Sequence, residues 1–252
     1  MKVLSIATQK GGTGKTTTAA ALAQAAAFNG RRVLAVDLDP QGNLSYTLGA
    51  RAGGPANAYN LLCGDPAEEN IIAAGNGQGL DVVPASYDLA AITSGKASAR
   101  RLLRALEPVR GFYDYVIIDT PATVGELLYN ALQAADGLLI PVQTDAYNIQ
   151  SLYQITDVAA QIRQTNRALS SIGVIITRFD GRTKYARQIR DAIRKQAEEI
   201  GLPFLGVIRQ TVAIQEAAAF QESLYKYAPK ATAAADYMAL YNHIEKALQE
   251  AD

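Results

Sequence analysis

Gln9-Lys10-Gly11-Gly12-Thr13-Gly14-Lys15-Thr16-Thr17 is the stretch of sequence that decides the fold. It follows a short apolar run, Lys2–Thr8, and it precedes an Ala-rich run, Lys15–Phe28. A glycine-rich loop that ends in Gly-Lys-Thr between a strand and a helix is typical of loops that wrap phosphate groups. These residues therefore predict a phosphate-binding loop at the edge of an α/β sheet.

The residue types in this loop fit a nucleoside triphosphate with Mg²⁺. Backbone N–H groups of glycines turn inward around phosphate oxygens, and the N-terminus of the following helix adds positive potential. In this pattern Lys15 reaches the β- and γ-phosphates, and the hydroxyl of Thr16 ligates Mg²⁺. The strict pattern has glycine where this chain has Gln9. The residues that we expect to bind the nucleotide are Gly11, Gly12, Thr13, Gly14, Lys15, Thr16 and Thr17.

Short runs rich in Val, Ile and Leu alternate with longer Ala-rich runs along the rest of the chain, as in parallel strands that helices bury on both faces. The predicted strands are Lys2–Thr8, Val33–Asp37, Leu80–Pro84, Tyr115–Asp119, Leu138–Val142, Ile172–Thr177 and Phe204–Ile208. The predicted helices are Lys15–Phe28, Ser98–Glu107, Val124–Ala134, Ile149–Gln164, Thr183–Glu199 and Ala231–Leu248. We expect an α/β fold of a single domain, residues 1–252, with a doubly wound, mostly parallel sheet and helices on both faces.

Residues 50–79 interrupt this alternation. Glycine and proline are frequent there, and the sequence predicts two short helical pieces around Asn57–Leu62 and Pro66–Ala74. We interpret the segment as an irregular insertion within the domain rather than as a linker between two domains.

Carboxylates follow two of the predicted strands at their carboxyl ends, where open α/β sheets bind ligands. Asp37 and Asp39 are two residues apart, so they share a face and could both address Mg²⁺ and an attacking water. Asp39 could instead only cap the following turn. Asp119 ends an apolar run and is a candidate Mg²⁺ ligand, ahead of a switch loop that starts at Thr120. The single histidine, His243, lies in the last predicted helix, so catalysis would depend on positioning and charge neutralisation.

Lys10-Gly-Gly-Thr-Gly-Lys-Thr-Thr resembles the deviant Walker A motif of the ParA/MinD group of P-loop NTPases. The resemblance implies an ATP-bound homodimer in which Lys10 reaches the partner's nucleotide, while Lys15 binds in cis and Asp39 positions the water. A lysine supplied in trans would act as an arginine finger does in other phosphoryl-transfer enzymes. The alternative for Lys10 is a solvated lysine at a loop tip.

Further segments resemble the short chromosomal ParA proteins. They are Pro141-Val142-Gln143-Thr144, Thr177–Thr183, Gln215-Glu216-Ala217 and Tyr227–Lys230. The resemblance implies a Mg²⁺-dependent ATP hydrolase, slow until a ParB-like protein stimulates it, that uses ATP and ADP in chromosome or plasmid partitioning. It also implies a cytoplasmic, nucleoid-associated protein. Three alternatives stay open: a related ATPase that positions another cargo, a metabolic phosphotransferase or ligase similar to dethiobiotin synthetase, and a non-catalytic DNA-bound scaffold.

A basic stripe follows the sixth predicted strand. Seven cations and two carboxylates lie between Arg178 and Lys195, and three of the arginines fall at helical spacing on one face. We expect this face to bind DNA phosphates without sequence preference, although a solvated helix face is the alternative. The predicted contacts are Arg182, Lys184, Arg187, Arg190 and Arg194. Short ParA proteins typically carry a DNA-binding arginine where this chain has Ala213, and Arg209 is a candidate substitute.

Composition excludes several other classes of protein. Lys+Arg and Asp+Glu are 24 each among 252 residues, so net charge gives no overall attraction to DNA or membrane. The single cysteine, Cys63, excludes an intramolecular disulfide and a cluster site within one chain. No run approaches the roughly 20 apolar residues of a spanning helix, and the acidic end, Glu245–Asp252, is poorly suited to anionic lipid. We therefore expect neither export nor membrane binding.

Overall fold

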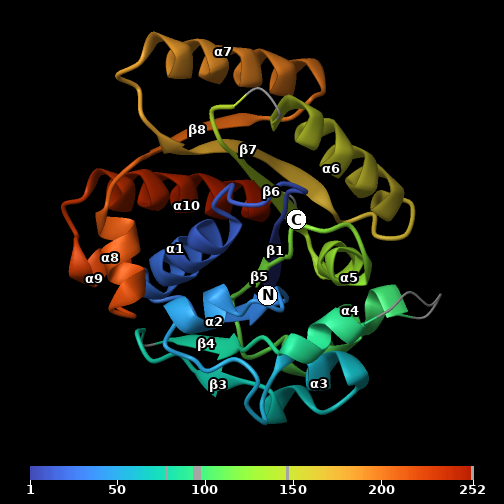
Figure 1. The fold of residues 1–252 in the computed structure, drawn as a ribbon. Helices are drawn as coiled ribbons and strands as arrows, with labels where there is room; N and C mark the ends of the chain where they lie inside the picture. The colour runs from blue at the N-terminus through green and yellow to red at the C-terminus, as the bar shows by residue number, and fades with distance from the viewer. Residues whose placement is uncertain (78, 93–97, 146–147, 251–252) are drawn as a thin grey trace.

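The computed structural model describes residues 1–77, 79–92, 98–145 and 148–250, and it contains one eight-stranded sheet (Figure 1). Gln78 of the predicted insertion, and the last two residues of the acidic end, lie outside the described residues. The strand order is β3-β4-β2-β5-β1-β6-β7-β8. The strands are β1 (Lys2–Ile6), β2 (Val33–Asp37), β3 (Ile72–Ala73), β4 (Leu80–Val83), β5 (Tyr115–Asp119), β6 (Gly137–Val142), β7 (Ser170–Phe179) and β8 (Phe204–Arg209).

Every neighbouring pair in this sheet is parallel except β3 with β4, so the predicted doubly wound, mostly parallel sheet is confirmed. Parallel strands need crossover connections, and the helices of those crossovers cover both faces. The helices are α1 (Lys15–Phe28), α2 (Asn43–Thr47), α3 (Ala58–Cys63), α4 (Arg101–Leu106), α5 (Glu126–Ala134), α6 (Asn148–Arg163), α7 (Lys184–Glu199), α8 (Ala213–Ala219), α9 (Leu224–Tyr227) and α10 (Thr232–Glu250).

Two apolar cores lie on the two faces of the sheet. One core packs residues of β2, β5 and β6 against α3, α4, α5, α6 and α7. The other packs the opposite side chains of the strands against α1, α2, α8, α9 and α10. Alternation along each buried strand explains the division, because successive side chains point to opposite faces. Among the described residues, no helix is both long and apolar enough to cross a bilayer.

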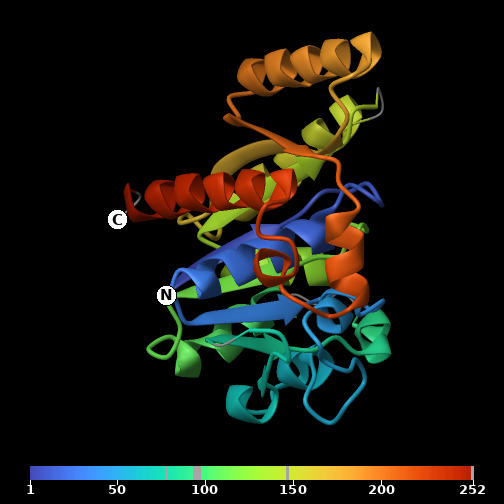
Figure 2. The ribbon, with the colours of Figure 1, turned by 90° about the vertical axis from the view of Figure 1, so that its left-hand side faces the viewer.

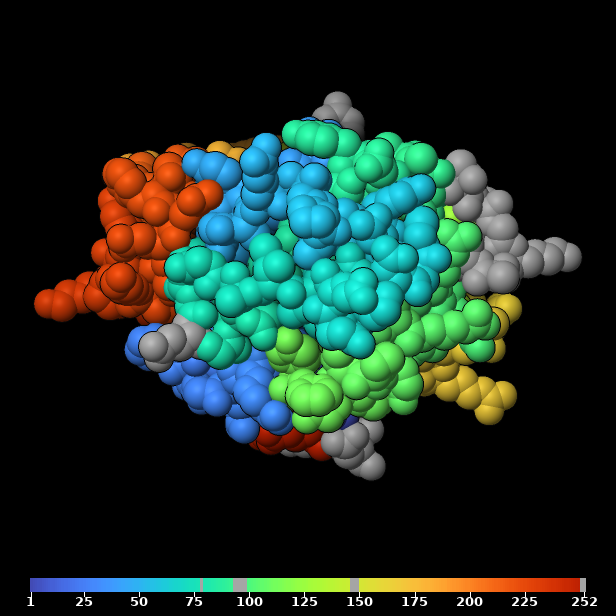
Figure 3. Space-filling model, turned by 90° about the horizontal axis from the view of Figure 1, so that it is seen from below, coloured from blue at the N-terminus to red at the C-terminus, as the bar shows by residue number. Residues whose placement is uncertain are grey.

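The two edges of the sheet differ. Figures 1 and 2 place α7 beyond the β8 edge and α3 near the β3 edge, at opposite ends of the molecule. Seen from below, the surface at the β3 edge is formed mainly by the chain between β2 and β5 (Figure 3). This end contains the predicted insertion.

The predicted helix over Pro66–Ala74 is wrong in part. Ala67–Glu69 is a single 3₁₀ turn, and Ile72–Ala73 forms β3 by pairing antiparallel with Val82 and Asp81. A two-residue edge strand depends on its partner strand and leaves no periodicity in the sequence. The short helices α2, α8 and α9 were not predicted either, since each has seven residues or fewer.

Candidate nucleotide site

A cavity of about 450 Å³ opens at the carboxyl ends of the central strands. The predicted phosphate loop lines one end, and the ends of β7 and β8 with α8 line the other. Of the predicted loop residues, Thr13 alone does not line the cavity, since its side chain is buried behind it. The volume is in the range of small-molecule and cofactor sites.

Two glycines of the loop adopt left-handed backbone conformations, with φ of 76° at Gly12 and 85° at Gly14. A Cβ at Gly14 would lie 3.2 Å from the Oγ1 of Thr177 on β7. That hydroxyl lies 2.6 Å from the carbonyl oxygen of Thr13, and the side-chain amide of Gln143 donates to the carbonyl of Gly12. Side chains at the ends of β6 and β7 therefore stabilise the conformation of the loop by hydrogen bonds to its carbonyl oxygens.

Lys15 begins α1 directly after Gly14, and its side chain lies in the cavity wall with only 7% of the residue exposed. The ammonium donates a hydrogen bond to the carbonyl oxygen of Lys10 at 3.3 Å, which closes the loop. Burial lowers the pKa of Lys15, and the charges of Asp119 and Asp39 oppose this shift. A buried cation beside a glycine-rich loop is suited to a polyanionic ligand.

Asp37 and Asp119 face each other as registered neighbours on β2 and β5. Oδ2 of Asp37 accepts hydrogen bonds from the backbone N–H and the hydroxyl of Ser45, at 2.8 and 2.7 Å, and Oδ1 accepts from the N–H of Asp39. Burial raises the pKa of Asp37 to about 6, against these hydrogen bonds. Oδ2 of Asp37 is thus occupied by Ser45, whereas Oδ1 accepts only the one backbone hydrogen bond from the residues that the structure describes.

Asp119 differs from Asp37 because both of its carboxylate oxygens are buried without a hydrogen-bond partner in the described part of the chain. Burial raises the pKa of Asp119 well above its usual value, the charge of Asp37 adds to the shift, and the Thr16 hydroxyl and the Lys15 ammonium oppose it. An unsatisfied buried carboxylate is costly unless a cation meets it. This donor set fits Mg²⁺, which is commonly held by one or two carboxylates together with substrate phosphates.

Asp39 lies between these buried carboxylates and the open cavity, half-exposed. Its Oδ1 accepts a hydrogen bond from the N–H of Gln41 at 3.0 Å, so it caps the following turn as well as lining the cavity. The cap is therefore present, and the positioning of a water by Asp39 stays a prediction.

Lys10 takes a different direction from Lys15. Its ammonium pairs with the carboxylate of Asp145, beyond the end of β6, and Lys10 is not among the described residues that line the cavity. The side chains of Lys10 and Asp145 are 31% and 36% exposed, so the pair lies at the surface. Lys10 is thus held by an ion pair at the surface, and its role toward a partner's nucleotide stays a prediction.

Comparison with known proteins gives the family. A family model described as an AAA domain matches residues 1–171. The chromosome-partitioning ATPase Soj of Thermus thermophilus is 36% identical over 249 residues, which cover 98% of this chain and 97% of Soj. The chromosome partitioning protein ParA of Caulobacter vibrioides is 35% identical, over 97% of this chain and 94% of that protein. The chain belongs to the ParA/MinD family of P-loop ATPases.

Solved structures agree with this family and with its fold. A cobyrinic acid a,c-diamide synthase from Mycobacterium smegmatis, crystallised with an ATP analog and magnesium, has a TM-score of 0.85 at 30% identity and covers 100% of this chain and 97% of its own. McdA from Cyanothece, as a variant in complex with ATP, has a TM-score of 0.83 at 26% identity, over 99% and 96% of the two chains. The resemblance stated from the phosphate loop is confirmed.

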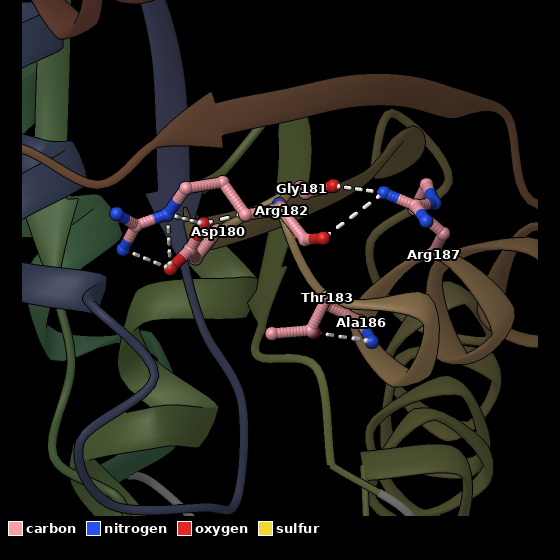
Figure 4. Close-up of polar contacts among 6 residues, drawn as sticks. All are labelled: Asp180, Gly181, Arg182, Thr183, Ala186 and Arg187. Carbon is pink, nitrogen blue, oxygen red and sulfur yellow. Dashed lines mark hydrogen bonds and ion pairs between the residues drawn. The ribbon is translucent and has the colours of Figure 1, made fainter.

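The basic segment predicted to bind DNA lies on and before α7, at the end of the molecule farthest from α3 (Figure 1). The hydroxyl of Thr183 caps the helix by accepting from the N–H of Ala186. Arg182 forms a bidentate ion pair with Asp180, and Arg187 donates hydrogen bonds to the carbonyl oxygens of Gly181 and Arg182 (Figure 4). These side chains stay exposed, but their donors are partly used within the segment.

Acidic residues within α7 form ion pairs with three further cations of the same helix. Arg190 contacts Asp191, and Arg194 and Lys195 contact glutamates one turn later, Glu198 and Glu199. With these two glutamates included, the net charge from residue 178 to residue 199 is +3. The surplus of positive charge over the segment is therefore smaller than the count to Lys195 indicates.

At the end of the cavity far from the phosphate loop lie Thr177-Arg178 and the Ile208-Arg209-Gln210 turn, which the sequence indicated only as plausible neighbours of adenine. Arg178, with φ of 52°, lies at a bulge between β7 and β8 and lines this end, as do Arg209 and Gln210. Ala213, where short ParA proteins have arginine, is 9% exposed at the start of α8. Arg209 is paired with Asp236 of α10, so its guanidinium is already engaged.

Proposed function

We propose that this ParA/MinD-family chain is a Mg²⁺-dependent ATPase that forms a homodimer around ATP, binds double-stranded DNA without sequence preference and releases it after hydrolysis. A ParB-like partner would stimulate hydrolysis. The cycle of ATP binding and hydrolysis would move chromosome or plasmid cargo across the nucleoid in the cytoplasm. The observation that carries the proposal is the buried cluster of Lys15 and Asp119 beside the phosphate loop.

Nucleotide binding is supported by three matching features at the loop end of the cavity. Left-handed Gly12 and Gly14 expose backbone N–H groups, α1 begins at Lys15 and directs its N-terminus to the cavity, and the Lys15 ammonium is already in place. These donors suit the oxygens of a triphosphate. Gly11, Thr13, Thr16 and Thr17 complete the proposed phosphate cradle.

Thr16 and Asp119 would ligate the metal. Asp37 would either contact the metal through a bound water or hold the Asp39–Ser45 segment in place. Mg²⁺ would neutralise charge that develops on the phosphate oxygens. Asp39, at the cavity edge, would orient the attacking water, since its carboxylate is half-exposed and held by the Gln41 N–H. Hydrolysis would then depend on alignment and on the charges of Lys10 and Lys15.

Dimerisation around ATP requires Lys10 to exchange partners. In this structure its ammonium pairs with Asp145 on the same chain. To reach the neighbouring subunit's nucleotide it would leave that carboxylate for a phosphate, which carries more charge. ATP would therefore favour the dimer by its differential affinity for the two states.

DNA binding in the dimer would use the exposed cations of the α7 segment, Arg182, Lys184, Arg187, Arg190 and Arg194. Surface ion pairs such as Arg194–Glu198 are worth little, so arginines can exchange them for DNA phosphates. Two copies of α7 in a dimer would double the number of phosphate contacts and so steepen the salt dependence of binding.

Two other functions have support from the structural neighbours. McdA has the same fold and was solved in complex with ATP. An ATPase that positions another cargo stays an alternative, and genomic neighbours would separate the two cases. The synthase from M. smegmatis keeps open a metabolic enzyme, with a small-molecule substrate beside the γ-phosphate. That reading gives Lys10 and the α7 cations no role.

Phosphate release by the purified full chain tests the proposal. We expect slow, Mg²⁺-dependent release from ATP that DNA and a ParB-like protein accelerate together. An enzyme whose phosphate release requires a small carboxylic acid, and is indifferent to DNA, would contradict the proposal and favour the metabolic alternative.

A further inference from the structure

The far end of the cavity is where the nucleobase would lie, if the phosphates bind the loop as proposed. The triphosphate anchored at Lys15 directs the rest of the nucleotide toward the ends of β7 and β8. Arg209 is one of the residues there, and it is 51% exposed at its side chain. What this arginine does to a base depends on how its guanidinium is held.

Asp236 of α10 fixes Arg209 through three hydrogen bonds. The Nε of Arg209 donates to Oδ2 at 2.9 Å, Nη2 donates to Oδ1 at 2.6 Å, and the backbone N–H donates to Oδ2 at 2.9 Å. The second hydrogen of Nη2 points at the carbonyl oxygen of Thr232, at 3.4 Å. Asp236 is only 15% exposed, so the pair is anchored on the protein side and open on the cavity side.

A second contact attaches the same turn of α10 to the phosphate end. Tyr237, next to Asp236, lines the cavity and is 1% exposed, and its hydroxyl lies 3.2 Å from that of Thr18 on α1. Adjacent residues of α10 thus bind both the wall at Arg209 and the helix that follows the phosphate loop. The wall at Arg209 is therefore connected through α10 to the helix that follows the phosphate loop.

A free arginine recognises guanine through two parallel N–H donors aimed at O6 and N7. Here the paired donors Nε and Nη2 are already taken by Asp236, which leaves the flat face of the guanidinium and Nη1. A guanidinium face stacks on any base, because every base has a π-face.

We propose that Arg209, held flat by Asp236, stacks on the base of the bound nucleotide, and that Asp236 disfavours guanine by occupying the donors that would read it. Arg209 is thus a base-binding residue, and Asp236 is a positioning residue that sets base specificity through it. The inference rests on the proposed nucleotide site and goes beyond it by naming the base-binding residue and what keeps that residue from favouring GTP.

Titration calorimetry of the full chain with three Mg²⁺-bound probes, ATP, GTP and inorganic tripolyphosphate, tests the role of Arg209. Arg209→Ala should weaken ATP binding about tenfold and leave tripolyphosphate unchanged, because only the base is lost as a partner. Unchanged ATP affinity would overturn the proposal. An equal loss for ATP and tripolyphosphate would overturn it as well, since Arg209 would then act on the phosphates.

The ratio of ATP to GTP affinity tests Asp236. Asp236→Ala should lower the ratio of ATP affinity to GTP affinity about tenfold, because the freed guanidinium can pair with guanine. In an Arg209→Ala background the same substitution should leave the ratio unchanged. A ratio that Asp236→Ala does not alter, or alters equally without Arg209, would overturn the specificity role, because a merely structural residue would behave in that way.

The chain supplies a matched control in Arg32 and Asp114. There too the arginine's backbone N–H donates to Oδ2 and its Nη2 to Oδ1 of the same aspartate, but neither residue lines the cavity. Arg32→Ala and Asp114→Ala should leave all three affinities unchanged. If wild type binds tripolyphosphate as tightly as ATP, the base adds no affinity and the inference fails alone; if it binds no probe, the proposed function fails first.

Discussion

The phosphate loop and the α7 segment both gather positive charge, but the structure holds the two sets in opposite ways. Lys15 is buried beside Asp119, whose carboxylate oxygens have no hydrogen-bond partner in the described part of the chain. The cations of α7 are exposed, and acids of the same helix pair with Arg190, Arg194 and Lys195.

This difference shows that the burial and the pairing of a charged group are more informative than the number of charged groups. A buried carboxylate without a partner destabilises the protein unless a ligand compensates, so Asp119 indicates a binding site. Exposed pairs contribute between zero and about 1 kcal/mol each, so they indicate little by themselves. The phosphate loop therefore carries the stronger functional argument, and α7 needs a direct test.

Loss of the buried cation should have the largest effect. Lys15→Ala should weaken Mg–ATP binding by at least ~100-fold, about 3 kcal/mol, because a desolvated charge-assisted contact to the phosphates disappears. Titration calorimetry measures the affinity. The exposed Lys226 on α9 offers a control, since Lys226→Ala should change ATP affinity by less than twofold. Similar losses in both variants would remove the distinction between buried and exposed cations.

The half-exposed carboxylate at the cavity edge should affect turnover rather than binding. Asp39→Ala should retain ATP affinity within about threefold and slow hydrolysis by roughly 100-fold, as expected for a group that orients the nucleophile. Single-turnover phosphate release, alongside calorimetry, separates the two quantities. Rapid turnover by this variant would show that Asp39 only caps the turn at Gln41.

Charge reversal on α7 tests whether that region functions despite its internal pairs. Arg187→Glu combined with Arg194→Glu should weaken duplex DNA binding about tenfold or more and lower the slope of log affinity against log salt by roughly two. Fluorescence anisotropy across a salt titration measures both. The control is Arg32→Glu with Arg110→Glu, which changes net charge equally at sites away from α7. Equal losses in the two double variants would mean that α7 is an ordinary solvated helix face.

The smallest expected effect is on the pH dependence of stability, which should differ between the buried carboxylates near the phosphate loop and those of the α7 segment. Asp37 and Asp119 have raised pKa values, about 6 for Asp37, so the native state binds more protons than the unfolded state between about pH 4 and the raised values. Stability without ligands should thus fall from pH 5 to pH 8, by roughly 1–2 kcal/mol through Asp37 alone and further through Asp119. Asp119→Asn should flatten this slope.

Asp180, from the α7 segment, is the contrasting carboxylate. Its bonds to Arg182 lower the pKa of Asp180 to about 2, so its contribution to stability is lost only below about pH 4. Urea unfolding at each pH measures the slope, and Asp180→Asn should leave it unchanged above pH 5. A slope of the same size in wild type and Asp119→Asn would contradict the account of the buried carboxylates.

How much the sequence could predict differs between the two ends of the cavity. The phosphate loop is contiguous, and its glycines and Lys15 lie between a strand and a helix, so the sequence predicted the cradle, α1 and the carboxylates that follow β2 and β5. The far end, where we propose that the base binds, is assembled from three separate parts of the chain: β7, β8 with the adjoining α8, and α10. The pairing of Arg209 with Asp236 spans 27 residues and depends on tertiary packing, so no local pattern indicates it.

The α7 segment shows a different limit. Helical spacing predicted that Arg187, Arg190 and Arg194 lie near one face, and α7 does span Lys184–Glu199. Their pairing could have been predicted in part, because Glu198 follows Arg194 at a distance of four residues. The strand β3 could not have been predicted, because its two residues form a strand only by pairing with β4.

Sedimentation velocity of the Asp39→Ala chain with saturating Mg–ATP tests the central claim most directly, because the claim is that ATP selects a dimer completed by Lys10. The account predicts a dimer with ATP, a monomer with ADP, and a monomer with ATP once Lys10→Ala is added. A chain that calorimetry shows to be saturated with ATP, but that sediments as a monomer, would contradict it.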